Sequence, residues 1–136
     1  MLAVHRVRDL HIDPIAHPRG RTYLSAASGL VRVGDQLYVV ADDEHYLAVF
    51  DATSPEAPGR LLRLFDGGLP ASPKKRKAQK PDIGSLTLLP AMRSDTGEPS
   101  PTALRLCRHQ GCTRDRPIAW ACASGGRGPP PSAHRP

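Results

Sequence analysis

The fold of this chain is decided by four short apolar runs between residues 28 and 65. They read SGLVRV (28–33), QLYVVA (36–41), HYLAVFD (45–51) and RLLRLF (60–65). Each run is rich in β-branched and aromatic residues and is bounded by turn formers, which is typical of consecutive antiparallel strands. Gly34 and Asp35 can form the first turn, because glycine tolerates a positive φ and aspartate can bond its own backbone. The stretch therefore predicts a four-stranded meander.

Two of these runs are apolar on both faces. In residues 37–40 (LYVV) and 47–50 (LAVF), successive side chains point to opposite sides of the sheet, yet both sides are hydrophobic. Such a sheet must be covered above and below, as a blade is in a β-propeller. We expect the most buried residues to be Leu30, Val31, Val33, Leu37, Val39, Val40, Leu47, Val49, Phe50, Leu62 and Leu64.

An internal echo supports a repeated unit. Residues 84–90 (GSLTLLP) resemble residues 28–34 (SGLVRVG), and Leu86 matches Leu30 at a spacing of 56 residues. Propeller blades are usually about 40 to 50 residues long, and the loop from Asp66 to Pro81 accounts for the difference. The predicted fold class is mainly β: one blade-like antiparallel meander, the start of a second, and a largely irregular C-terminal tail.

Four segments also carry a family resemblance: Ser28–Glu44, Leu47–Phe50, Gly59–Phe65 and Lys80–Pro90. They resemble a group of uncharacterised bacterial β-propeller proteins and, more distantly, propellers with phytase-type esterase activity. The resemblance covers about residues 20–90. Gly84 stands where that group usually has an acidic residue, and a full propeller needs several more blades. The resemblance implies a partial propeller-like region over residues 1–90.

Beyond Pro90 the composition changes. Residues 91–136 hold seven prolines, all three cysteines, the one tryptophan, and seven arginines with no lysine. Strand-like character returns only at Ala103–Leu106, and the end of the chain is low in complexity, so the segment is predicted to be disordered. Such a composition is what out-of-frame translation of GC-rich DNA would give. The leading hypothesis is therefore a truncated or frameshifted β-propeller-like protein without independent activity.

The N-terminal segment carries three expectations. Residues 1–10 are too polar for a secretory signal, and no stretch of the chain is long and apolar enough for a membrane span. With an odd cysteine count, this predicts a cytoplasmic protein. Leu2, Val4 and residues 7–10 fit a first strand that could close a propeller ring. We expect His5, His11 and His17 to be solvated loop and strand residues rather than metal ligands, because their spacing suits no helical metal site.

The acidic corner Asp42-Asp43-Glu44 allows two interpretations. With Asp82, these carboxylates could hold Ca²⁺ or supply a general base, as in a propeller-type phosphoesterase or esterase. Alternatively the corner is a hairpin turn whose charges face water. We favour the turn, because one short cluster cannot complete a coordination shell.

The loop after residue 65 is strongly basic, in a chain of net charge +6. Such a run can neutralise phosphates, so a nucleic-acid-binding protein is a second alternative. No aromatic residue is interleaved for base stacking, which favours a solvated loop between strands. The residues concerned are Lys74, Lys75, Arg76, Lys77 and Lys80.

Blade strands that lack neighbouring blades leave an apolar face and unpaired edges. Burial of apolar surface contributes roughly 25 cal/mol per Å², so an uncovered sheet face costs an amount comparable to the stability of a whole domain. We therefore expect a marginally stable chain that self-associates through exposed sheet faces and edges.

Overall fold

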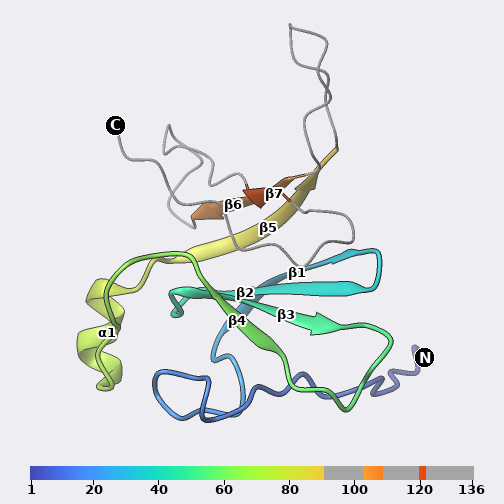
Figure 1. Cartoon of the computed structure of the whole chain (residues 1–136), viewed down its shortest axis with the longest axis horizontal. Helices are drawn as coiled ribbons and strands as arrows, with labels where there is room; N and C mark the ends of the chain where they lie inside the picture. The colour runs from blue at the N-terminus through green and yellow to red at the C-terminus, as the bar shows by residue number, and fades with distance from the viewer. Residues whose placement is uncertain (91–102, 109–119, 122–136) are drawn as a thin grey trace, which may run out of the picture.

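The computed structural model describes residues 1–90, 103–108 and 120–121 (Figure 1). Within these residues it contains two antiparallel sheets and one short helix, which confirms the mainly β prediction. The first sheet comprises β1 (Ala27–Val33), β2 (Gln36–Ala41), β3 (Tyr46–Asp51) and β4 (Arg60–Arg63). The helix α1 (Pro73–Gln79) leads to the second sheet, which comprises β5 (Ile83–Leu89), β6 (Ala103–Arg108) and β7 (Trp120–Ala121).

The first sheet is the predicted meander, with strands paired in sequential order. Leu30 pairs with Val39, and Tyr38 pairs with Val49. The turn between β1 and β2 contains Gly34 at φ +57°, a conformation that glycine adopts without steric cost. The prediction of the meander and of its first turn is confirmed.

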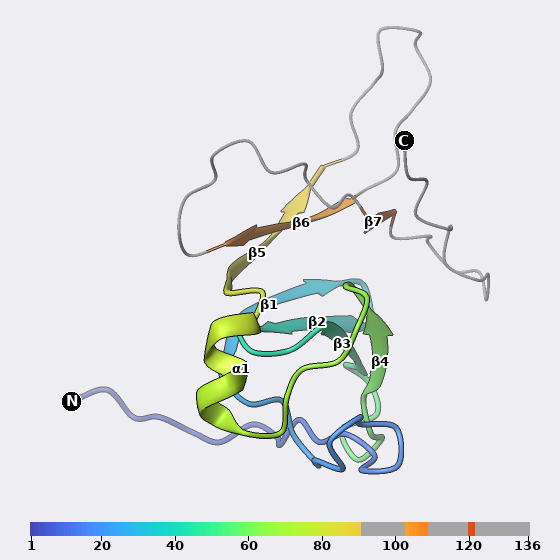
Figure 2. The same ribbon diagram turned by 90° about the vertical axis from the view of Figure 1, so that its left-hand side faces the viewer.

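One face of the meander packs against the second sheet. Val40, Leu47 and Val49 lie in one cluster with Ile83 and Leu86. Figures 1 and 2 show β5 running over β1 on this side. The contact is close at Gly29, where a Cβ atom would lie 2.8 Å from the backbone nitrogen of Leu86. Glycine is therefore required where the two sheets meet.

The opposite face is covered by the N-terminal segment, which lies below the first sheet in Figure 1. Ile12, which is 1% exposed, packs with Val39, Ala48 and Phe50. The Gly59 N–H donates to the carbonyl of His11 at 2.8 Å, which ties the segment to the start of β4. Both faces of the meander are thus buried, and the expectation that one is left open is wrong for this sheet.

The expected N-terminal strand is also wrong. Residues 1–11 form no strand, and the only bridge of the segment is the single pair Ile12–Gly59. Leu2, Val4 and Val7 are each more than 90% exposed. A strand needs a partner edge along its length, and none of the described strands runs beside these residues.

The burial prediction holds at most positions. Val39, Val40, Leu47, Val49 and Phe50 are buried. Five more of the expected core residues are half-buried, namely Val31, Val33, Leu37, Leu62 and Leu64. Leu30 is 55% exposed and was wrongly expected to be buried, because the N-terminal segment covers β2, β3 and β4 but not this part of β1.

Helix α1 corrects the expectation of a solvated loop over residues 66–81. Ser72 occupies the N-cap position, and Pro73 begins the helix, as proline often does because its missing N–H has no partner in the first turn. Lysine, arginine, alanine and glutamine, which fill its remaining positions, are good helix formers. Lys80, in extended conformation before Pro81, ends it.

Strands β1 and β5 are structural repeats of one another. Both are seven residues long, and their first residues, Ala27 and Ile83, lie 56 positions apart. Each begins with a register shift, between Ala27 and Gly29 in β1 and at the corresponding positions in β5. The residue before each strand has a positive φ, +54° at Ala26 and +56° at Asp82. The 56-residue spacing of the sequence repeat therefore also separates the strand starts, the bulges and the residues of positive φ.

Candidate functional site

The acidic corner between β2 and β3 is joined to two other segments through its backbone. The Asp42 N–H donates to the Ala26 carbonyl at 3.1 Å, and the Asp42 carbonyl accepts from the Asp82 N–H at 3.0 Å. Ala26 and Asp82 are the two non-glycine residues at positive φ among the described residues. Such backbone is strained and needs support from its surroundings, so Asp42 fixes the start of both β1 and β5.

Asp42 and Asp82 share one cation, the ammonium group of Lys80. Its Nζ contacts Asp42 Oδ2 and lies 3.0 Å from Asp82 Oδ1. The hydrogen bond to Asp42, followed by that to Asp82, raises the pKa of Lys80 above its ordinary value. The ammonium thus stands where a metal ion bridging these two carboxylates would have to bind.

Asp43 is paired with helix α1. Arg76 Nε lies 3.1 Å from Asp43 Oδ2, and the Ser25 hydroxyl donates to the same carboxylate at 2.8 Å. The Arg76 guanidinium also donates to the carbonyls of Pro70 and Ala71, at 3.2 and 2.9 Å. Arg76 therefore holds the loop before the helix as well as the acidic corner.

Glu44 is the most buried of the three corner carboxylates, with a side chain 3% exposed. Its Oε1 accepts from the Arg19 guanidinium, and His17 Nε2 lies 3.4 Å from the same oxygen. His17 Nδ1 accepts the Arg19 backbone N–H at 3.0 Å. A ring nitrogen that accepts a hydrogen bond carries no proton, so the proton of the neutral ring lies on Nε2.

These contacts correct the expectation that the acidic corner faces water, because each of its carboxylates has a cationic partner from a distant segment. They correct the expectation for His17 as well, since its side chain is 1% exposed. Within residues 1–90, 103–108 and 120–121, no three His, Cys, Asp or Glu side chains are grouped so that they could hold a metal ion. The Ca²⁺ hypothesis for Asp42, Asp43, Glu44 and Asp82 stays a prediction.

The basic run is divided between two environments. Arg76 and Lys80 are committed to the acidic corner. Lys74, Lys75 and Lys77 lie exposed on helix α1. The structure thus leaves three of the five residues open to a nucleic-acid phosphate.

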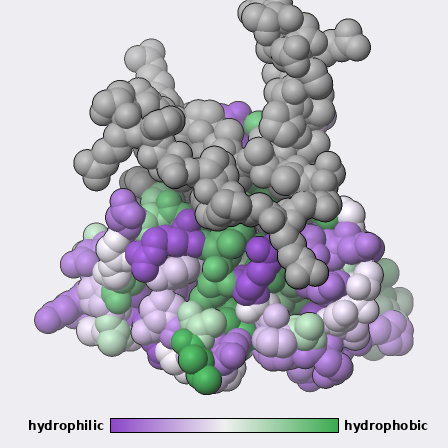
Figure 3. All heavy atoms as spheres, viewed as in Figure 1, coloured by the Kyte–Doolittle hydropathy of each residue, from purple (hydrophilic) through white to green (hydrophobic). Residues whose placement is uncertain are grey.

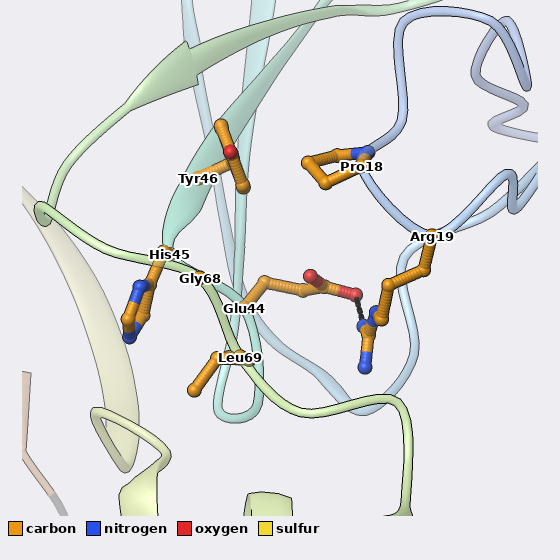
Figure 4. A pocket seen from close by; sticks show the side chains of 7 residues that line it. All are labelled: Pro18, Arg19, Glu44, His45, Tyr46, Gly68 and Leu69. Carbon is orange, nitrogen blue, oxygen red and sulfur yellow. Dashed lines mark hydrogen bonds and ion pairs between the residues drawn. The ribbon is translucent and has the colours of Figure 1, made fainter.

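A pocket of about 170 Å³ lies beside Glu44, as Figure 4 shows. We call it the Glu44 pocket. Its walls come from the N-terminal segment, the β2–β3 corner and the loop after β4. They are formed by Pro18, Arg19, Glu44, His45, Tyr46, Gly68 and Leu69.

Sequence reasoning missed His17 and Arg19 as partners of the corner. The two residues lie 25 or more positions before Glu44, and no local pattern connects them. The only signal in the sequence was that the apolar Ile12 is followed closely by His17 and Arg19. From the sequence, His17 was instead expected to be solvated.

The structure defines a mainly β protein with a four-stranded meander followed by a second sheet, whose first strand β5 has the same length and the same initial bulge as β1. None of its described helices is long and apolar enough to cross a bilayer. The chain belongs to the Family of unknown function (DUF6929), whose family model matches residues 23–98. No curated protein and no solved structure matches it. The family match includes Asp42, Arg76 and Lys80 but neither His17 nor Arg19.

Proposed function

We propose that the described part of this chain is a β-propeller-type unit, one four-stranded blade and the start of the next, which serves as a structural element without catalytic activity of its own. The observation that carries the proposal is the recurrence of β1 in β5 after 56 residues, with the same length and the same initial bulge. Repeats in which each unit buries a face against the next are the architecture of propellers.

The packing of β5 supports the same proposal. It contacts β1 and β2, the first strands of the preceding sheet, so equivalent strands of successive units are neighbours. The Ser28 hydroxyl donates to the Ile83 carbonyl at 2.6 Å across this junction. A stack of blades places the first strand of each sheet beside the first strand of the next.

The absence of independent activity is proposed because the carboxylates of the acidic corner are neutralised within the chain. A catalytic or Ca²⁺-binding carboxylate must offer oxygens to its ligand, whereas Lys80 occupies Asp42 and Asp82, and Arg76 occupies Asp43. The rival propeller-type phosphoesterase would need these pairs to break.

Hydrolysis of a chromogenic phosphate ester, with and without Ca²⁺, tests the proposal. The wild-type chain should give no rate above the buffer blank, and Ca²⁺ should leave its Tm unchanged. The variant Lys80→Met frees Asp42 and Asp82, so it is the matched control for a latent Ca²⁺ site. A Ca²⁺-dependent rate from the wild-type chain would establish the phosphoesterase instead.

The exposed lysines of α1 keep a nucleic-acid-binding role as a second candidate. Lys74, Lys75 and Lys77 are exposed on one short helix, and an interface built on three phosphate contacts is weak. Fluorescence anisotropy with a labelled duplex at low salt distinguishes the two. A structural unit gives a flat titration, whereas a binder gives a signal that falls steeply with salt and is lost when the three lysines are changed to glutamine.

We also propose that the unit self-associates through β1. Leu86, the repeat equivalent of Leu30, is 8% exposed because it packs on the preceding sheet, whereas Leu30 is 55% exposed. On the face shown in Figure 3, hydrophobic residues lie among hydrophilic ones. Light scattering over a concentration series should show a dimer that Leu30→Ser weakens. An unchanged monomer in both proteins removes this part of the proposal.

The composition after Pro90 supports a change of reading frame, which we propose lies beyond β6. The β6 strand still pairs with β5 in the register of β2 with β1, as in Leu86–Leu106 and Leu30–Val39. The nucleotide sequence after codon 108 tests this. An alternative frame should encode further strand-like repeats, and its absence would contradict the proposal.

A further inference from the structure

The Glu44 pocket contains a carboxylate that is fixed on one side and open on the other. Glu44 Oε1 faces both Arg19 and His17 Nε2. Its second oxygen, Oε2, accepts no hydrogen bond from any described residue, and Figure 4 shows it turned away from Arg19. A fixed carboxylate with one unused oxygen is a ready hydrogen-bond acceptor for a bound molecule.

The two opposite charges that line the pocket are paired with one another. The carboxylate of Glu44 is balanced by the guanidinium of Arg19. An incoming cation would find the carboxylate already neutralised, and an anion would be repelled by Oε2. The charges therefore select a neutral ligand.

The pocket offers a hydrogen-bond acceptor and hydrogen-bond donors. Oε2 of Glu44 accepts, and the Arg19 guanidinium has five N–H groups, of which the Glu44 pair uses one. The hydroxyls of a polyol match these groups, since one can donate to Oε2 while another accepts from Arg19.

The walls suit the carbon skeleton of such a compound. Pro18 and Leu69 are apolar, and the Tyr46 ring is held in place by Arg63, whose Nη2 donates to the Tyr46 hydroxyl at 2.9 Å. The pocket has a volume of about 170 Å³, more than a single water molecule needs. A small polyol or one edge of a sugar ring fits this space.

We propose that the Glu44 pocket binds a neutral polyhydroxyl compound, a sugar or polyol, through hydroxyl groups held by Glu44 and Arg19. This binding role is separate from the structural role proposed above, and it needs no reaction at the site. A ligand of this size that makes two polar contacts binds weakly, with a Kd of about 1–10 mM.

Amide NMR of the full chain, titrated with myo-inositol and with glycerol, tests the proposal. We expect saturable shifts confined to the pocket residues, and no saturation with sodium acetate or methylammonium chloride at equal concentration. Myo-inositol binding in preference to glycerol would indicate a ring, and the reverse an open-chain polyol. Both results support a polyhydroxyl site.

The variant Gly68→Phe provides the decisive comparison. A Cβ at Gly68 meets no atom within 4 Å, so the change leaves the Glu44–Arg19 pair intact and places a ring at the pocket. Binding should weaken at least tenfold, whereas Glu56→Gln, on an exposed carboxylate outside the pocket, should bind as the wild type does. Equal affinity in Gly68→Phe, no saturable shift with either polyol, or tighter binding of an ion would overturn the proposal.

Discussion

The hairpins β1–β2 and β5–β6 pair their residues in the same register yet bury equivalent residues differently. Leu30 and Leu86 occupy the same position in the repeat, but they are 55% and 8% exposed. Gly29 lies under β5, whereas its equivalent, Ser85, is exposed on the outer side of the second sheet. The backbone of the repeat is thus set locally, while burial depends on what packs against each copy.

The largest expected effect separates the two leucines. Leu86→Ala removes a buried side chain between the sheets and should lower the free energy of unfolding by about 2–4 kcal/mol. Leu30→Ala should lower it by less than about 1 kcal/mol, because that side chain is already half in water. Urea denaturation of both variants checks this. Equal losses would mean that Leu30 is buried in solution, and would break the comparison.

A smaller effect should separate Gly29 from Ser85. The Cβ of Gly29→Ala would lie 2.8 Å from the Leu86 backbone nitrogen, so β5 must move. We expect a loss of about 1–3 kcal/mol, as for other overpacked sites. Ser85→Ala should stay within about 0.5 kcal/mol. Thermal unfolding of the two variants is the measurement, and a neutral Gly29→Ala would show that the sheets do not meet in this way.

Lys80 pairs with Asp42 at the end of β2 and with Asp82 at the start of β5. These ion pairs should contribute about 1 kcal/mol to the free energy of unfolding, as a partly exposed ion-pair network does. The pKa of Lys80 is raised in the folded chain above its ordinary 10.5. Its contribution is therefore fully present below about pH 10.5 and is lost as the pH rises through the folded-state pKa. Unfolding of wild type and Lys80→Met from pH 7 to 12 tests this: the difference in stability should be constant at first and then shrink. A difference that grows with pH contradicts the assignment.

The smallest effect is expected at the N-terminus, outside both units. Arg6 and Asp9 form an ion pair whose side chains are 78% and 68% exposed, so water and salt screen it. Arg6→Ala should leave the midpoint of urea unfolding unchanged. A measurable loss would mean that Arg6 packs on the sheets in solution.

The meander was predictable because its signals are local. Gly34 at the first turn, the apolar runs and the bounding polar residues all lie within a few positions of the strands that they define. The start of β5 was predictable for a different reason, since it repeats β1. The first prediction rests on short-range patterns and the second on a repeat, and the tertiary structure overrode neither.

The missed features are long-range or were masked by charge. Ser72 and Pro73 are a helix-start signal for α1, but the run of like charges that follows indicated a solvated loop. In the structure Asp43 pairs with Arg76 and so neutralises one of these charges. The burial of His17 depends on Glu44, 27 positions away. No periodicity in the sequence reports a pairing of this kind.

The cover formed by Ile12 has a consequence for how the chain folds. Ile12 bridges to Gly59 and packs on Phe50, so the N-terminal segment cannot complete its docking until residue 59 has been synthesised. Contacts between residues so distant in sequence close late. Until then the apolar side chains of Val39, Ala48 and Phe50 are exposed to water and to other nascent chains. Aggregation should be fastest during this interval. The slow step of folding should therefore be docking of the N-terminal segment, and removing Met1–Arg6, which are exposed, should leave it unchanged whereas Ile12→Ala should slow it.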